Sequence, residues 1–307
     1  MKKLMVAAAA AFCATVGLAD VTSANIVGYL GTEFGDQGMV RKGASFATIG
    51  IKDALDNDCV RLSDLKVTGY APGTYVWGDA TITMLENNGS NTKCSDGSTN
   101  LEYLWIDDGV DGEWGYPAGW YGPDTLPMTE EGGSIAGIAS EITFAAGEGI
   151  NFTVGSGKED WQLQTAGEVL SAPVSRKFLD QGMVLVANPL PRRVTLSEIK
   201  VSGYAPGTYV WGDATITVLE NNGANTKCSD GSTNLEYLWI DDGVDGEWGY
   251  PAGWYGPDTL PMTEEGGSIA GDATKIGYEA GDGFYFTIAS GKEDWQVDFP
   301  SLGLKAE

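Results

Sequence analysis

Short segments in which hydrophobic and polar residues alternate run along the whole chain. β-Branched and aromatic residues are concentrated in segments 74–77, 81–85 and 102–107, and segment 81–85 alternates polar with apolar positions. Segments 142–144 and 150–154 flank a Gly-containing stretch and predict a hairpin. Gly, Asn and Asp punctuate the chain about every 8–12 residues, as in sandwiches and small barrels. The only helical signal is one turn at 62–65. The pattern therefore predicts an all-β protein.

The pattern is duplicated. Residues 66–137 match residues 200–271 at a constant offset of 134 with only three mild exchanges, and looser similarity continues to residues 162 and 296. Upstream, residues 36–40 match residues 180–184 at an offset of 144, so the first copy carries ten extra residues between 41 and 62. We predict two tandem β-sandwich or barrel-like repeat domains, residues 20–165 and 166–307.

The N-terminus has the features of a secretory signal peptide. Lys2 and Lys3 precede an apolar run over residues 4–18, and Gly17 and Ala19 form a small-x-small exit before Asp20. The run is short for a membrane span, although an uncleaved anchor is the alternative, and no later stretch approaches the roughly 20 apolar residues that a span needs. We predict that residues 1–19 are removed and that the protein is secreted, either extracellular or at the cell surface, with no membrane span in the mature chain.

Charge and composition narrow the function classes. The net charge is −25 at pH 7, and removal of residues 1–19 leaves 43 acids against 16 bases. The electrostatic field of so many negative charges repels nucleic acid and anionic lipid and attracts divalent cations. The chain contains no histidine, which excludes Ser-His-Asp and Cys-His catalysis and His-ligated metals. Glu130, Glu131 and Glu148 could in principle run glycosidase chemistry, but solvated turns are the favoured interpretation. We predict that the protein is not an enzyme.

Two acid-rich loops are candidate calcium sites. Segment 107–113 places four acids in seven residues and recurs at 241–247. Carboxylate oxygens suit calcium, but the spacing is not that of an EF-hand, since Gly109 holds the third place and Ala118 the twelfth. The favoured alternative is a polar turn in which Asp-Gly makes the bend. No cofactor is required, and calcium is the candidate cation. The candidate ligands are Asp107, Asp108, Asp111, Asp241, Asp242 and Asp245.

The most unusual segment combines aromatic residues with Gly and Pro over residues 114–124. Its aromatics cannot all follow strand periodicity, so some are candidates to lie on the surface and stack against sugar rings, with Asp108 and Asp124 accepting hydroxyl hydrogen bonds. The alternative, which we favour, is that they cover a core, because aromatic residues dominate core burial. The candidate ligand-binding residues are Trp114, Tyr116, Trp120, Tyr121, Trp248, Tyr250, Trp254 and Tyr255.

Three cysteines remain after cleavage: Cys59, Cys94 and Cys228. In an oxidising compartment one pair can form and one thiol is left over. A Cys59–Cys94 bond would lie within one repeat and leave Cys228 for an intermolecular bond, whereas a Cys59–Cys228 bond would join the repeats. Three free thiols are the third alternative.

Several short motifs carry a resemblance. The segments Ser-Ala-Asn-Ile-Val-Gly-Tyr at 23–29, Gly-Met-Val-Leu-Val-Ala-Asn-Pro-Leu at 182–190 and Gly-Asp-Gly-Phe-Tyr-Phe at 281–286 resemble a group of exported bacterial β-rich proteins of uncharacterised function. The first copy departs from that pattern at 43–46, where it has Gly-Ala-Ser-Phe. The resemblance implies a secreted β-rich protein and transfers no catalytic residues.

These observations favour an exported structural or assembly protein that associates with itself through an edge-forming N-terminal segment. The alternative hypothesis is a bivalent carbohydrate-binding or adhesive module that recognises a surface glycan through its aromatic loops. A hydrolase is the weakest hypothesis.

Overall fold

The computed structural model describes most of the chain between residues 27 and 302. The described ranges are 27–33, 38–43, 45–48, 50–52, 56–84, 101–109, 115–129, 132–177, 182–218, 235–243, 249–263, 267–292 and 294–302. The region 1–19, the expected signal peptide, lies outside them. Within the described ranges, no helix is long and apolar enough to cross a membrane.

In the residues that the structure describes, the first half of the molecule, residues 27–168, forms three antiparallel sheets from ten strands. Their orders are β1-β10-β4, β2-β9-β5-β6-β7 and β3-β8. The 3-10 turn Leu62–Asp64 follows β3, as the sequence predicts. The strands are β1 (Val27–Glu33), β2 (Gly38–Gly43), β3 (Cys59–Arg61), β4 (Lys66–Thr68), β5 (Val76–Met84), β6 (Leu101–Asp107), β7 (Gly119–Tyr121), β8 (Thr143–Ala145), β9 (Gly149–Val154) and β10 (Gln162–Glu168).

The second half, residues 174–299, repeats this arrangement strand for strand. Its sheets have the orders β11-β20-β14, β12-β19-β15-β16-β17 and β13-β18. The equivalent 3-10 turn is Leu196–Glu198. The strands are β11 (Val174–Lys177), β12 (Gly182–Ala187), β13 (Val194–Thr195), β14 (Lys200–Ser202), β15 (Val210–Val218), β16 (Leu235–Asp241), β17 (Gly253–Tyr255), β18 (Gly277–Tyr278), β19 (Gly283–Ile288) and β20 (Gln296–Phe299).

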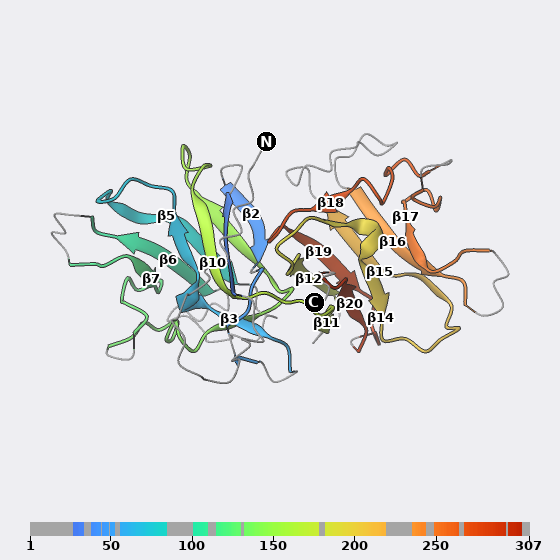
Figure 1. The fold of residues 1–307 in the computed structure, drawn as a ribbon, viewed down its shortest axis with the longest axis horizontal. Helices are drawn as coiled ribbons and strands as arrows, with labels where there is room; N and C mark the ends of the chain where they lie inside the picture. Colours follow the sequence, from blue (N-terminus) through green and yellow to red (C-terminus); the bar gives the residue numbers. More distant parts are fainter. Residues whose placement is uncertain are drawn as a thin grey trace, which may run out of the picture.

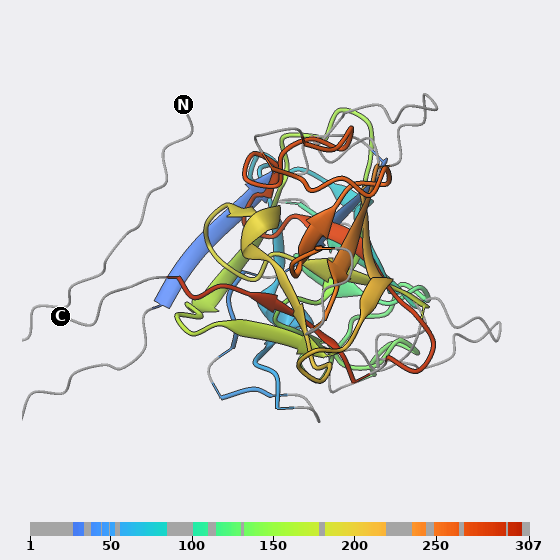
Figure 2. The same ribbon diagram turned by 90° about the vertical axis from the view of Figure 1, so that its right-hand side faces the viewer.

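Every sheet takes its strands from one half only. The halves lie side by side along the long axis, with β5–β7 toward one end and β15–β17 toward the other (Figure 1). Figure 2 views the molecule along that axis, with the orange and red strands of the second half in front. The prediction of an all-β protein is confirmed. The expected repeat boundary at 165/166 stays a prediction, and β10 and β11 flank it at Glu168 and Val174.

The expected hairpin of segments 142–144 and 150–154 is wrong. The strand β8 pairs with β3, and β9 pairs with β2 on one side and β5 on the other. Glu148 explains the divergence, because its Oε2 accepts the Ala145 N–H at 2.9 Å and its own N–H is donated to the Ala145 carbonyl at 2.8 Å. The resulting tight turn ends β8 and starts β9 in another sheet.

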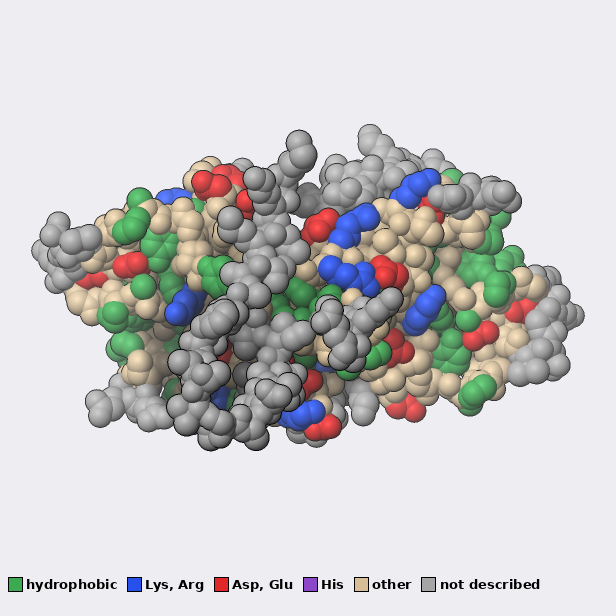
Figure 3. All heavy atoms as spheres, in the orientation of Figure 1, with side chains coloured by type: hydrophobic (Ala, Val, Ile, Leu, Met, Phe, Trp, Pro, Cys, Tyr) green, Lys and Arg blue, Asp and Glu red, His purple; other side chains and the backbone are tan. Residues whose placement is uncertain are grey.

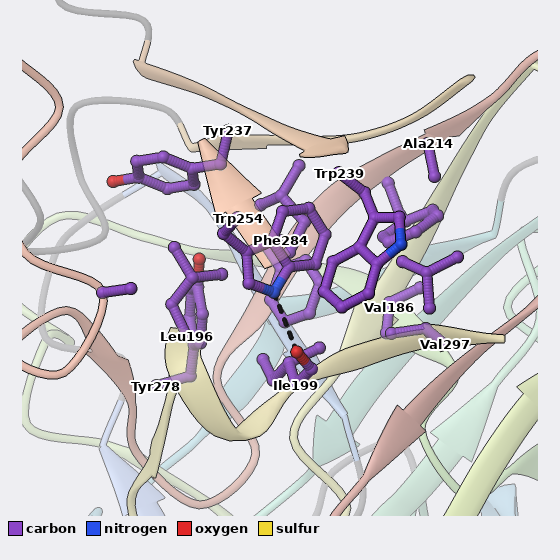
Figure 4. Packing of buried hydrophobic residues seen from close by; sticks show 14 of the residues in the cluster. Val186, Leu196, Ile199, Ala214, Tyr237, Trp239, Trp254, Tyr278, Phe284 and Val297 are labelled. Atoms are coloured by element: carbon purple, nitrogen blue, oxygen red, sulfur yellow. Dashed lines mark hydrogen bonds between the residues drawn. The ribbon is translucent and has the colours of Figure 1, made fainter. Parts of the chain in front are cut away.

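Each half encloses its own hydrophobic core, and both cores are rich in aromatic side chains. In the second half, the Trp254 ring packs against those of Trp239 and Phe286. Its indole N–H is donated to the Ile199 carbonyl at 2.8 Å (Figure 4). Trp120 makes the same bond to the Leu65 carbonyl in the first half. A buried indole needs such a partner because an unpaired buried N–H is costly.

Candidate binding site

Two large aromatic side chains stand on the outer face of the molecule where β5 begins. Val76 is fully buried, and its neighbours Tyr75 and Trp77 are 54% and 37% exposed. This follows from the pleat, since successive side chains on a strand point to opposite faces. The register of β5 against β6 shifts between Trp77 and Thr81, so a bulge follows the exposed pair.

The exposed rings form an ordered group with a third residue from the acid-rich loop. The Tyr75 and Trp77 planes are 15° from parallel with centroids 6.1 Å apart. Tyr116 meets Trp77 edge-on at 5.0 Å and 83° and is itself half-buried. The Tyr121 ring in turn packs edge-on against the Tyr116 ring, with the two centroids 5.4 Å apart. We call Tyr75, Trp77 and Tyr116 the aromatic cluster.

The second half carries the same aromatic cluster, made of Tyr209, Trp211 and Tyr250. Tyr209 and Trp211 are 53% and 37% exposed. Their planes are 14° from parallel with centroids 6.1 Å apart, and Tyr250 meets Trp211 at 5.0 Å and 82°. Apolar side chains are visible on the surface toward both ends of the long axis in Figure 3. The molecule therefore presents two equivalent aromatic surfaces.

Carboxylates hold the loop that supplies Tyr116. Asp108 Oδ2 accepts the backbone N–H groups of Gly115 and Tyr116 at 2.7 and 3.4 Å. The Asp108 N–H is donated to the Tyr116 carbonyl at 2.9 Å, and the Tyr121 hydroxyl is donated to the Pro117 carbonyl at 2.8 Å. Charge-assisted bonds of this kind are stronger than neutral ones, so Tyr116 sits on a preorganised loop.

Asp107 connects the same loop to a chain of hydrogen bonds that begins at Trp105. The Trp105 indole N–H is donated to the Tyr70 hydroxyl at 2.9 Å, and that hydroxyl is donated to Asp107 Oδ2 at 3.0 Å. Asp107 Oδ1 accepts the Gly109 N–H at 3.1 Å. Burial raises the pKa of Tyr70 to about 12, with the Asp107 carboxylate adding to the shift, so the phenol keeps its proton and remains a donor at neutral pH.

The expected aromatic ligand-binding residues divide into three groups. Four of them are buried, as the favoured interpretation predicts: Trp120, Tyr121, Trp254 and Tyr255. The expectation that they stack against sugar rings on the surface is therefore wrong for these four. Tyr116 and Tyr250 belong to the aromatic clusters. Trp114 and Trp248 lie outside the described residues.

The expected calcium ligands are brought together only in part. Asp107 and Asp108 bind backbone and tyrosine donors as described, and Asp241 and Asp242 repeat those bonds. Asp111 and Asp245 lie outside the described residues. In the part of the chain that the structure describes, no group of three or more His, Cys, Asp or Glu side chains is arranged to hold a metal ion. Calcium binding stays a prediction.

Of the cysteines, only Cys59 lies in the described residues. It is buried in β3, with its Sγ 3.3 Å from the Asn57 carbonyl oxygen. Cys94 and Cys228 lie outside the described ranges, so the pairing alternatives stay predictions.

Sequence reasoning did not single out Tyr75, Trp77, Tyr209 and Trp211 as binding residues. The signal was present in segment 74–77, where polar, aromatic, aliphatic and aromatic residues alternate. If Val76 faces the core, both of its neighbours must face outward.

Comparison of the chain with protein-family models, with curated proteins and with solved structures gave no match. The fold and the aromatic clusters therefore define it as an all-β protein with a duplicated exposed aromatic site.

Proposed function

We propose that the protein is an exported, bivalent carbohydrate-binding or adhesive protein. The observation that carries the proposal is the aromatic cluster, present once in each half with near-parallel exposed rings. The ring faces offer apolar area that the C–H face of a sugar ring covers well, and a tyrosine hydroxyl is a group that can both donate to and accept from sugar hydroxyls. Tyr and Trp suit such a site because they join an apolar body to a polar tip.

Preorganisation supports a binding role. Trp77 is held edge-on by Tyr116, and the Asp108 carboxylate fixes the Tyr116 backbone. A ligand therefore meets rings whose freedom is already restricted, and the entropic cost of binding is lower. The strong negative charge of the chain favours neutral or amino-sugar polymers over uronic-acid or sulfated polymers.

The test is affinity electrophoresis of the mature chain in gels that contain a neutral β-linked glucan, with a uronic-acid polymer in parallel gels. We expect retardation by the neutral polymer, and we expect Trp77→Ala with Trp211→Ala to abolish it because both stacking surfaces are lost. The matched control is Leu126→Ala with Leu260→Ala, which removes two apolar side chains of 46% exposure outside the clusters. Equal retardation of the two double variants would contradict the proposal, as would the absence of retardation by any polymer in a panel of neutral and amino-sugar polymers.

Self-association is a second candidate function, supported by the position of β1. This strand ends the order β1-β10-β4 and pairs on one side with β10, and its Tyr29 is exposed. An edge strand can accept another chain. Light scattering of the unreduced mature protein, with calcium and then with a chelator, tests this. Large species in both conditions would support association through the edge strand, and large species that collapse on chelation would support cation-bridged assembly. A monomer in both conditions would contradict self-association.

A further inference from the structure

Strand β1 is the longest edge of the three-stranded sheets, and its outer side is unpaired within the described residues. Its seven residues, Val27–Glu33, pair with β10 along their whole length. No backbone hydrogen bond or isolated bridge joins them to another described segment. Since alternate residues of an antiparallel strand direct their N–H and C=O groups to opposite sides, about half of these groups in β1 point away from β10. Such an edge is a template for a further strand.

The outer face of β1 places a large exposed ring next to a residue without a side chain. Tyr29, Gly31 and Glu33 alternate along the strand and share one face, on which Tyr29 is 60% exposed. Leu30 is half-buried on the opposite face. A Cβ on Gly31 would collide with the side-chain amide of Gln162 on β10. The Gly31 backbone is therefore covered by that amide from the β10 side and carries no side chain of its own.

We propose that two copies of the chain associate through β1, with the two β1 strands antiparallel and Leu30 opposite Leu30 of the partner subunit. The inference rests on the second candidate function, self-association, and gives it a defined surface and partner. Each copy supplies the same groups in this register, so the contact is isologous and closes as a dimer. The two three-stranded sheets then continue into each other across the dimer axis.

The side chains of β1 complement one another in this register. Tyr29 lies opposite Gly31 of the partner subunit, so each exposed ring covers the glycine of the other copy. An aromatic ring across from an edge glycine stabilises a strand pair. Glu33 lies opposite position 27, so the two Glu33 carboxylates stand at opposite ends of the pairing. A register centred on Glu33 would place them directly opposite each other, which is destabilising for like charges.

The equivalent edge of the second half is a poorer surface for the same contact. Strand β11 (Val174–Lys177) has only four residues. Fewer backbone groups are therefore available for pairing than on β1. The net charge of −25 opposes any approach of two copies, so the β1 dimer should be tighter at high ionic strength than at low ionic strength.

The first test is disulfide cross-linking of the mature full-length chain, with serine in place of Cys94 and Cys228. In the proposed register residue 30 faces its own copy, with Cα atoms about 4.5–5.5 Å apart, which is within reach of a disulfide. Two residues at position 33 are roughly 20 Å apart. We expect mild oxidation to convert Leu30→Cys into covalent dimers and to give at least about tenfold less dimer from Glu33→Cys, the matched control.

The second test needs no added thiol. Tyr29→Ala should raise the dissociation constant of the dimer roughly tenfold in sedimentation equilibrium, because two ring–glycine contacts are lost. The matched control is Leu126→Ala, which removes an apolar side chain of 46% exposure outside β1 and should leave the constant unchanged. Near-ultraviolet circular dichroism checks that every variant is folded.

The outcomes separate this inference from the functions proposed above. A chain that stays monomeric at every accessible concentration and ionic strength would overturn both the β1 dimer and self-association. A dimer in which Leu30→Cys and Glu33→Cys cross-link equally would overturn the β1 register alone, and so would equal dissociation constants of Tyr29→Ala and Leu126→Ala. No glycan enters either experiment, so the results are independent of the proposed carbohydrate binding.

Discussion

At the scale of single residues, several described carboxylates hold loops in place by accepting hydrogen bonds from backbone N–H groups. Asp124 shows the principle outside the aromatic cluster: its Oδ1 accepts the Ser134 hydroxyl at 2.6 Å and its Oδ2 accepts the Ile135 N–H at 2.8 Å. Burial by itself would raise the pKa of the Asp124 carboxyl, but these bonds and one from the Leu126 N–H outweigh it and lower the pKa below 3.8. Asp258 repeats the arrangement.

A lowered folded-state pKa gives stability that is present above the unfolded-state pKa and is lost as pH falls through the folded-state value. Asp124→Asn with Asp258→Asn should therefore lower the free energy of unfolding at pH 7 by about 1 kcal/mol per site. The difference from the wild type should be smaller at pH 3, because pH 3 lies below the usual pKa of a carboxyl and protonation of the unfolded chain then offsets part of the stability that the ionised carboxyls give the folded state. Urea unfolding at both pH values measures it, and a difference that stays constant with pH would contradict the assignment.

At the scale of elements, the bulge in β5 is the feature that connects the fold to the aromatic cluster. Gly78 follows Trp77 and has a φ of +67°, and Gly212 repeats it at +69°. Only glycine adopts such a backbone without a steric penalty. A bulge re-aims the side chains beside it, so the orientation of Trp77 depends on Gly78.

Gly78→Ala should lower the free energy of unfolding by about 1 kcal/mol through backbone strain, since its Cβ would meet only Leu104 at an ordinary 3.6 Å. It should also weaken glycan retardation at that cluster because Trp77 turns. The matched control is Gly119→Ala, whose φ is not positive and whose nearest contact would be 3.9 Å away. Denaturant unfolding and affinity electrophoresis check both effects, and equal behaviour of the two variants would argue against the bulge as the positioning element.

At the scale of the whole molecule, each aromatic cluster lies on the central strand of its five-stranded sheet and on the loop before the far edge strand, away from the edge strand that meets the other half. The five-stranded sheets run from β2 to β7 and from β12 to β17, with β2 and β12 at the shared contact. The clusters involve the start of β5 and β15 and the loops that precede β7 and β17. Two equivalent sites on one particle give avidity for a polymer without any new contact.

This arrangement predicts a difference between one and two altered sites. Trp77→Ala alone should lower retention on a glycan-coated surface by roughly a hundredfold or more, because avidity is lost. The affinity of the intact second site for a short soluble oligosaccharide should not change. Surface binding and calorimetry measure the two quantities, with Trp211→Ala as the mirror variant. Retention that falls by only half would mean that the clusters bind independently.

The sequence predicted the β character, the duplication and the helical turn after β3 because each is a local or self-similar property. Alternation with period two is visible within one strand, and an offset of 134 needs no partner to be recognised. The strand at 102–107 was predicted within a residue of β6. Segments 74–77 and 81–85 were predicted as separate strands and form the single bulged strand β5, because the bulge is a property of its pairing with β6.

The sequence by itself determined which residues can line a core and which face of β5 points outward. Only the tertiary structure decided that Trp120 and Tyr121 enter the core while Tyr116 from the same segment supports Trp77, because Gly- and Pro-rich loops have no periodicity that assigns a face. It also decided that β8 and β9 join different sheets and that Gly43 meets Gly281 across the halves. Partners far apart along the chain are chosen by packing and by the pairing of backbone groups, and a local pattern of hydrophobic and polar residues does not encode them.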